Sequence, residues 1–209
     1  MACGGALKEF PTGKTADDLV CPPAMRNGPI RIPSDEECRQ LMADMGMLEH
    51  IVAHSRQVCR VALFLSDHAG LPCLDRELIR AAALLHDITK TRSFQTQEPH
   101  AETGARLLTE LGYPEVARVV GQHVRLASCR PAGRPTAAQI VNYADKRVLH
   151  DRIVPLHDRM AYILERYGLN LERKRYLLSL WRKTERLEGR LFAPLPFAPD
   201  DLSRLLPEA

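Results

Sequence analysis

An unusually apolar segment in the middle of the chain ends in two adjacent polar residues. Leu78, Ile79, Ala82 and Leu85 recur at helical spacing and lead directly into the pair His86-Asp87. This spacing predicts a helix that lies at the centre of the fold. A carboxylate in such an apolar setting must be paired, hydrogen-bonded or bound to a metal. We therefore expect a buried helix whose C-terminal end is a chemical site.

The rest of the chain from Ser34 onward is a succession of helical patterns. Two capping boxes, Ser34 with Glu37 and Thr136 with Gln139, each open a helix. First-turn prolines or apolar residues at helical spacing predict the other helices. No internal repeat or convincing strand is evident, so the expected fold is all-α, a single bundle of about seven to eight helices. The predicted helices begin near residues 34, 48, 75, 99, 114, 136 and 155, with another through 176–187.

Three regions follow from where prolines and glycines interrupt the helical pattern. We expect an irregular N-terminal arm over 1–33, one domain over 34–190 and an extended C-terminal tail over 191–209. A length of 209 residues suits one hydrophobic core. Asp75 is the expected cap of the central helix. Gly189 marks the expected end of the domain.

Composition excludes several classes of protein. Hydrophobic residues make up 45% of the chain and the formal net charge is only +3, so neither a disordered chain nor a dedicated nucleic-acid binder is indicated. The six cysteines never occur two residues apart, which favours free thiols in a reducing compartment. Without a signal sequence or a membrane span, cytoplasmic residence is expected. The fragment Gly13-Lys14-Thr15 has Lys8 where a phosphate-binding loop needs glycine.

Four more residues on other helices could join His86-Asp87 at a metal site. All are histidine or aspartate at a helix end or on an apolar face, and all can coordinate a divalent transition metal. Adjacent residues point about 100° apart within a helix, but at a helix end the backbone can turn both toward one ion. The four residues are His54, His100, His123 and Asp145, whereas His50, His68, His150 and His157 are expected at the surface or behind the ligands.

These motifs resemble the HD-domain superfamily of metal-dependent phosphohydrolases. His54, the segment LLHDITK and the segment NYADKR follow one another in that family's order, and the resemblance covers about residues 40–165. It implies an HD-domain helical fold in which one metal is held by four residues. By matching motif these are His54, His86, Asp87 and Asp145.

Two further histidines resemble a branch of the family that binds a second metal. In that branch the central aspartate bridges the two metals, which implies that role for Asp87 and makes His100 and His123 the added ligands. The His-Asp-x-x-Lys pattern is closest to the bacterial diadenosine tetraphosphate hydrolases and to stand-alone proteins with a His-Asp-Ile-Gly signature. This chain has Thr89 in place of that glycine. Gly112-Tyr113-Pro114 fits a helix stop followed by a helix start better than a cyclic-dinucleotide phosphodiesterase signature.

The residue types predict the metal and the chemistry. Mixed histidine and carboxylate ligands favour one or two divalent transition metals, iron or manganese first, with cobalt, nickel and zinc compatible. A hydroxide bridging two metals would be the nucleophile on phosphorus, so Asp87 and Lys90 are the candidate catalytic residues. The candidate phosphate contacts are Lys90, Arg125, Lys146 and Arg147.

The expected function is hydrolysis of a phosphoester or phosphoanhydride bond in a nucleotide, either a dinucleoside polyphosphate or a nucleoside phosphate. The expected partner is this small molecule, with no nucleic acid and no membrane, and a homodimer is left open. One alternative is a non-catalytic nucleotide-sensing or scaffold module that keeps the metal site. Another is a helical protein in which His86-Asp87 only stabilises the core.

Overall fold

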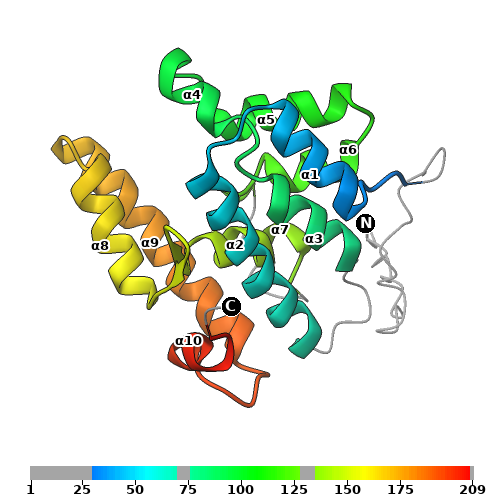
Figure 1. The fold of residues 1–209 in the computed structure, drawn as a ribbon. Helices are drawn as coiled ribbons and strands as arrows, with labels where there is room; N and C mark the ends of the chain where they lie inside the picture. Colours follow the sequence, from blue (N-terminus) through cyan, green and yellow to red (C-terminus); the bar gives the residue numbers. More distant parts are fainter. Residues whose placement is uncertain (1–29, 70–75, 128–134, 208–209) are drawn as a thin grey trace, which may run out of the picture. The chain divides into compact units, whose positions relative to one another are not determined.

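The apolar segment before His86 forms a helix at the centre of the domain. In this computed structural model, which describes residues 30–69, 76–127 and 135–207, α3 (Arg76–Leu85) packs against α2 (Glu49–His68), α6 (Pro114–Val120) and α7 (Ala137–Asp145). Ala81, Ala82 and Ala83 are fully buried, and their small side chains let neighbouring helices approach closely. Figure 1 shows α2, α3 and α7 together in the interior. These three helices provide the framework on which the other elements are placed.

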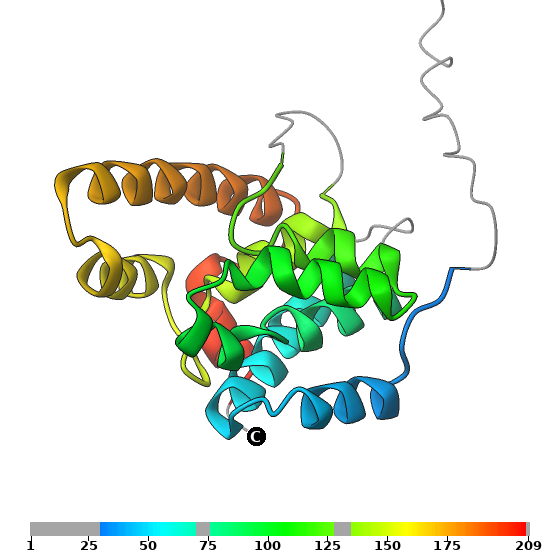
Figure 2. The same cartoon turned by 90° about the horizontal axis from the view of Figure 1, so that it is seen from above.

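The remaining elements surround this centre. In the part of the chain that the structure describes, the architecture is all-α with one short antiparallel strand pair, β1 (Val148–Leu149) and β2 (Arg152–Ile153). Figure 2 shows α8 and α9 side by side as a hairpin next to the central helices. The other helices are α1 (Asp35–Asp44), α4 (Lys90–Thr96), α5 (His100–Glu110), α8 (Leu156–Tyr167), α9 (Leu171–Phe192), the 3₁₀ helix η1 (Pro199–Asp201) and α10 (Leu202–Leu205).

The helix starts and stops follow the sequence signals closely. Ser34 and Thr136 form the two expected capping boxes. Gly112 has a φ of 84° just beyond α5, and Pro114 is the first residue of α6. A left-handed conformation favours glycine, so Gly112-Tyr113-Pro114 is a helix stop and start, as predicted.

Two short α-helices and the 3₁₀ helix were not predicted. The first, α4, has no buried residue and therefore no apolar stripe to detect. The second, α10, corrects the expected extended tail over 191–209, since α9 runs through Gly189 to Phe192 and Leu202 is fully buried in the core. Pro199 opens the 3₁₀ helix, and Asp201 accepts a hydrogen bond from the Ala198 amide at 2.9 Å. Pro199 therefore initiates a turn of helix and does not extend the chain.

Some predictions fall on residues that the structure does not describe. They are residues 1–29 of the expected arm over 1–33, the Gly13-Lys14-Thr15 fragment, the Asp75 cap and four of the cysteines. Cys38 and Cys59 are described, and both are free and buried. No helix within 30–69, 76–127 or 135–207 combines the length and apolarity that a membrane crossing requires.

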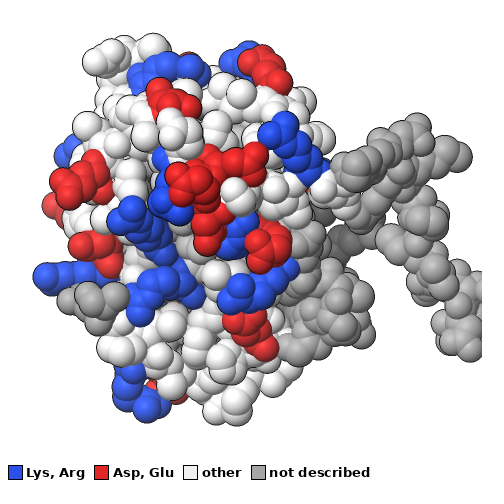
Figure 3. Space-filling view, turned by 45° about the vertical axis from the view of Figure 1, so that its right-hand side comes forward, with Lys and Arg blue, Asp and Glu red and all other residues white. Residues whose placement is uncertain are grey.

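Two acidic side chains of α1 form ion pairs with residues outside the helix. Arg80 on α3 forms ion pairs with Asp35 and Glu77, and Arg31 lies 3.2 Å from Glu37. On the face shown in Figure 3, basic and acidic side chains are interspersed among uncharged ones. This face therefore has no large area of one sign.

Candidate metal centre

Helix ends bring five of the six predicted ligands to one face of α2. His86 and Asp87 directly follow α3, and His123 follows α6 by three residues. His100 is the first residue of α5 and Asp145 the last of α7. His54 projects from the buried face of α2. The six residues, far apart in sequence, thus form one cluster, which we call the His-Asp cluster: His54, His86, Asp87, His100, His123 and Asp145.

The cluster has two halves that meet at Asp87. Candidate ligand atoms of His54, His86 and Asp87 lie within 4.8 Å of one another, and so do those of Asp87, His100 and His123. In the first half, Asp145 Oδ1 lies 3.1 Å from His54 Nε2 and 3.7 Å from His86 Nε2. In the second half, His100 Nε2 and His123 Nε2 are 3.1 Å apart.

The two oxygens of Asp87 face different halves. Oδ2 lies 3.5 Å from His86 Nε2. Oδ1 lies 3.2 Å from His100 Nε2 and 3.5 Å from His123 Nε2. A carboxylate placed in this way can bind one cation through each oxygen.

Backbone carbonyls orient three of the imidazole rings. Nδ1 of His86 donates to Ala83 O at 2.8 Å, and Nδ1 of His123 donates to Val120 O at 2.7 Å. Nδ1 of His54 lies 2.7 Å from the carbonyl of His150. In a neutral imidazole, a proton on Nδ1 leaves Nε2 with a lone pair that can bind a cation.

Electrostatics place the cluster in the protonation state that metal binding requires. Burial lowers the pKa of His86 to about 4 and also lowers the pKa of His100. Burial alone would raise the pKa of Asp87, but the charges of His86 and Lys90 and the hydrogen bonds of His100 and His123 hold it well below its usual range. At neutral pH His86 and His100 are then neutral and the Asp87 carboxylate is ionised.

Asp145 is held ionised in the same way. Burial opposes its ionisation, but the charge of Lys146, the hydrogen bond with His54 and the charges of His86 and Arg159 hold the pKa of Asp145 well below its usual range. Both carboxylates of the cluster are therefore anionic in a largely buried setting.

One buried atom in the cluster has no hydrogen-bond partner. His86 is fully buried, and among the described residues its Nε2 forms no hydrogen bond. An unsatisfied buried nitrogen is costly unless something absent from the protein chain binds it. A cation between His54, His86 and the two carboxylates would satisfy this atom, so the residues present fit a metal.

Thr89 and Gly104 bring α5 close to the His-Asp turn. Thr89, which replaces the glycine of the His-Asp-Ile-Gly signature, donates through Oγ1 to the His100 carbonyl at 2.8 Å. A Cβ on Gly104 would lie 3.3 Å from the Ile88 side chain, tighter than most such contacts. The absence of that Cβ allows the close approach that brings His100 to Asp87.

The predicted phosphate contacts have different surroundings. Lys90 is near the cluster, with Nζ 3.5 Å from Asp87 Oδ1 and 3.4 Å from His100 Nε2. Arg125 is exposed and lines a pocket beside α9. Lys146 is buried and donates to His123 O, Asn142 O and Asp145 Oδ2. The three N–H groups of Lys146 Nζ are therefore already used on two backbone carbonyls and the Asp145 carboxylate.

Arg147 does not face the cluster, and its prediction as a substrate contact is wrong. The side chain is 1% exposed, and its guanidinium donates to Tyr143 Oη at 2.6 Å and to Glu188 Oε2 at 3.3 Å. It also donates to Val154 O and Pro199 O at 2.9 Å each. With every donor group engaged, Arg147 connects α7 to α9 and η1 instead of binding a ligand.

Two residues outside the six are near the cluster: His150, which was expected at the surface or behind the ligands, and Arg159, which had no recognised sequence signal. His150, with a φ of 57°, supplies the carbonyl that orients His54. Its ring packs edge-on against Tyr162 at 5.7 Å, and the guanidinium of Arg159 lies 5.8 Å from the same Tyr162 ring. Arg159 Nε is buried without a hydrogen-bond partner among the described residues. The only feature of the sequence that points to Arg159 is its place as a basic residue near the start of α8, the first helix after Asp145.

Comparison with known proteins gives three similarities. Residues 51–148, which contain all six residues of the cluster, match the family model described as HD domain. The tRNA (cytidine(56)-2'-O)-methyltransferase of Picrophilus torridus is 30% identical over 142 residues, which are 62% of this chain and 40% of that protein. This chain thus spans less than half the length of that relative. A crystal structure of a predicted HD superfamily hydrolase from an uncultured Thermotogales bacterium has a TM-score of 0.46 and 21% identity, over 78% of this chain and 94% of the other.

Proposed function

We propose that this chain is a phosphohydrolase that uses two divalent transition metals to cleave a nucleotide phosphoester or phosphoanhydride bond. It belongs to the HD-domain superfamily, whose family model matches residues 51–148. The observation that carries the proposal is the placement of Asp87. Its two carboxylate oxygens face separate groups of histidines, and one of those histidines has a buried nitrogen without a partner.

The proposed ligands divide into two sets that share Asp87. His54, His86 and Asp145 would hold the first metal, and His100 and His123 would hold the second. Metals bound in this way supply a Lewis acid for the phosphoryl group and lower the pKa of water. Histidine nitrogens with carboxylate oxygens favour iron or manganese over magnesium, which prefers oxygen donors.

Cationic side chains border the His-Asp cluster and would bind the phosphoryl oxygens. Lys90 lies beside Asp87 and is partly exposed, so it can reach a ligand as well as the carboxylate. Arg159 has a guanidinium without a hydrogen-bond partner among the described residues, and its charge acts on Asp145. Fixed positive charges at the site where negative charge develops stabilise the transition state for phosphoryl transfer. We therefore assign both residues to the transferred phosphoryl group.

A small phosphorylated molecule suits this chain better than a nucleic acid. The Picrophilus relative is a tRNA methyltransferase by name, but the match spans only 40% of it. A nucleic-acid interface needs a continuous basic surface. The face in Figure 3 instead mixes both signs, and the formal net charge is +3. Neither the face shown nor the net charge indicates a nucleic-acid interface.

Metal analysis combined with hydrolysis assays tests the proposal. Protein purified without chelators should contain two equivalents of metal and release phosphate or nucleotide from at least one member of a nucleotide panel with Mn(II), Fe(II) or Co(II). The His157→Gln variant is the control because that side chain is 71% exposed and outside the cluster. Metal-loaded protein that hydrolyses no member of the panel would favour the non-catalytic sensing or scaffold module.

A further inference from the structure

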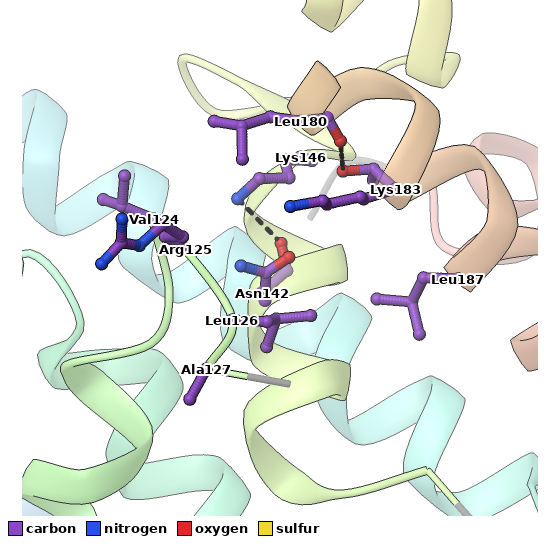
Figure 4. A pocket seen from close by; sticks show the side chains of 10 residues that line it. Val124, Arg125, Leu126, Ala127, Asn142, Lys146, Leu180, Lys183 and Leu187 are labelled. Atoms are coloured by element: carbon purple, nitrogen blue, oxygen red, sulfur yellow. Dashed lines mark hydrogen bonds between the residues drawn. The ribbon is translucent and has the colours of Figure 1, made fainter. Parts of the chain in front are cut away.

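A basic pocket lies next to the His-Asp cluster. It is formed where the segment 124–127 faces α9, with Asn142 and Lys146 of the α7 region behind it (Figure 4). Its volume is about 110 Å³. Pockets that enclose a whole drug-sized ligand begin at about 300 Å³, so this one suits a single substituent of a larger ligand.

The lining of the pocket has positive charge and no carboxylate. Arg125, Lys146 and Lys183 contribute the charges, and no Asp or Glu occurs among the lining residues. Among the described residues, Arg125 and Lys183 form no side-chain hydrogen bond or ion pair, although many exposed basic side chains in the rest of the domain do. Two unpaired cations on opposite walls of one pocket are complementary to an anion.

Lys146 forms the wall that the pocket shares with the His-Asp cluster. Its Nζ donates to Asp145 Oδ2 at 3.3 Å and to His123 O at 2.8 Å, so it contacts a residue from each half of the cluster. Asn142 adds a second connection, since its Nδ2 donates to His123 O at 2.7 Å. The pocket and the cluster are therefore adjacent, and the Lys146 side chain lies between them.

The donors still available in the pocket belong to Arg125 and Lys183. Lys146 uses its donors on Asn142 O, His123 O and Asp145, and the Thr184 hydroxyl donates to Leu180 O at 3.0 Å. The remaining surface is apolar, from Leu126, Leu180 and Leu187. Such a site suits a compact anion attached to an organic group.

We propose that this pocket binds a second phosphate group of the substrate, one that is not attacked at the His-Asp cluster. The inference rests on the proposed function and narrows it, because it selects nucleotides with more than one phosphate over nucleoside monophosphates. Lys183 lies on α9, outside the residues 51–148 that match the HD domain. One of the two available cations of the pocket is thus supplied by α9, outside the matched residues.

Binding to the metal-free protein tests the pocket separately from catalysis. We would titrate ADP and adenosine, in chelator and without Mg²⁺, into the wild type, Lys183→Glu and the control Arg182→Glu. Arg182 is the neighbouring exposed cation on α9 and does not line the pocket. The wild type should bind ADP at least about tenfold more tightly than adenosine, and Lys183→Glu should weaken ADP binding by about tenfold, as expected for loss of one charge-assisted contact. Arg182→Glu should change it by less than about twofold.

Undetectable ADP binding by the wild type, or equal weakening by Lys183→Glu and Arg182→Glu, overturns the proposal. Hydrolysis is measured separately with p-nitrophenyl phosphate, which has one phosphate. A wild type that binds ADP through Lys183 but hydrolyses nothing contradicts the proposed function and supports the pocket. A wild type that hydrolyses nucleotides with no dependence on Lys183 supports the proposed function and contradicts the pocket.

Discussion

His86 and Asp87 are neighbours in the chain, yet both face one point, with His86 Nε2 3.5 Å from Asp87 Oδ2. Within a helix two adjacent side chains would diverge by about 100°. The end of α3 at Leu85 removes that restriction, since residues 86–89 form a turn. The helix end therefore allows Asp87 to face His86 with one oxygen and His100 and His123 with the other.

Removing the charge of Asp87 should eliminate both metals. Asp87→Asn keeps the size of the side chain but loses the anionic oxygens that face the two groups of histidines. We expect metal content to fall in both halves and the rate of hydrolysis to fall by more than about a hundredfold. Losing a residue that only hydrogen-bonds a metal ligand costs up to about a hundredfold, and losing a ligand itself should cost more. Inductively coupled plasma mass spectrometry and the nucleotide assay measure the two effects. Asp158→Asn, at an exposed carboxylate, is the matched control, and unchanged metal content in Asp87→Asn would contradict this role.

Arg159 should matter for turnover and not for metal binding. Arg159→Ala removes a guanidinium whose charge acts on Asp145 and whose Nε has no hydrogen-bond partner among the described residues, and we expect kcat/KM to fall about a hundredfold, as for loss of one transition-state donor. Arg159→Lys should recover part of this loss because it restores the charge. Arg166→Ala, an exposed arginine on the same helix, should leave kcat/KM unchanged. Loss of metal in Arg159→Ala would show that the residue is structural instead.

Arg147 should matter for stability and not for catalysis. Its guanidinium is buried and paired with Glu188, and removing one partner of a buried ion pair costs about 3 to 5 kcal/mol. We expect Arg147→Met to lower the free energy of unfolding by about that amount while KM and metal content stay the same. Urea denaturation followed by circular dichroism measures the first effect. A raised KM with unaltered stability would restore Arg147 as a substrate contact.

The metal-free protein should lose stability in mild acid. Burial lowers the pKa of His86 in the folded chain from 6.5 to about 4, so below pH 6.5 the unfolded chain binds a proton that the folded chain does not. Stability is thus fully present above 6.5 and decreases as the pH falls toward 4, by about 3 kcal/mol over the window. Denaturant titrations in chelator should show this slope, and His86→Gln should flatten it where His157→Gln does not. An equal slope in His86→Gln would assign the effect to other groups.

Part of the cluster could be anticipated from the sequence because several of its residues follow a helix signal. Pro99 precedes His100, and the apolar run of α3 precedes His86 and Asp87. Helix periodicity and capping determine where such residues lie along an element. Helix ends meeting at a shared centre then follow from burying the apolar faces together.

The roles of the neighbouring cations could not be anticipated. Arg147 was predicted at the cluster because it is two residues from Asp145. Two residues correspond to about 200° around a helix, and the Arg147 side chain faces α9. The carbonyl of His150 depends on a left-handed residue in a hairpin turn, and Arg159 depends on how α8 folds back. Such contacts depend on the tertiary packing of segments that are distant in sequence, and local sequence patterns do not show which of these segments meet.

The most direct test of the account is the anomalous scattering of manganese in crystals of the wild type. We predict two peaks, one among His54, His86 and Asp145 and the other between His100 and His123, with the Asp87 carboxylate between them. A single peak in the first half would reduce the centre to one metal and remove the bridging role of Asp87. No peak at these residues would contradict the metal centre itself.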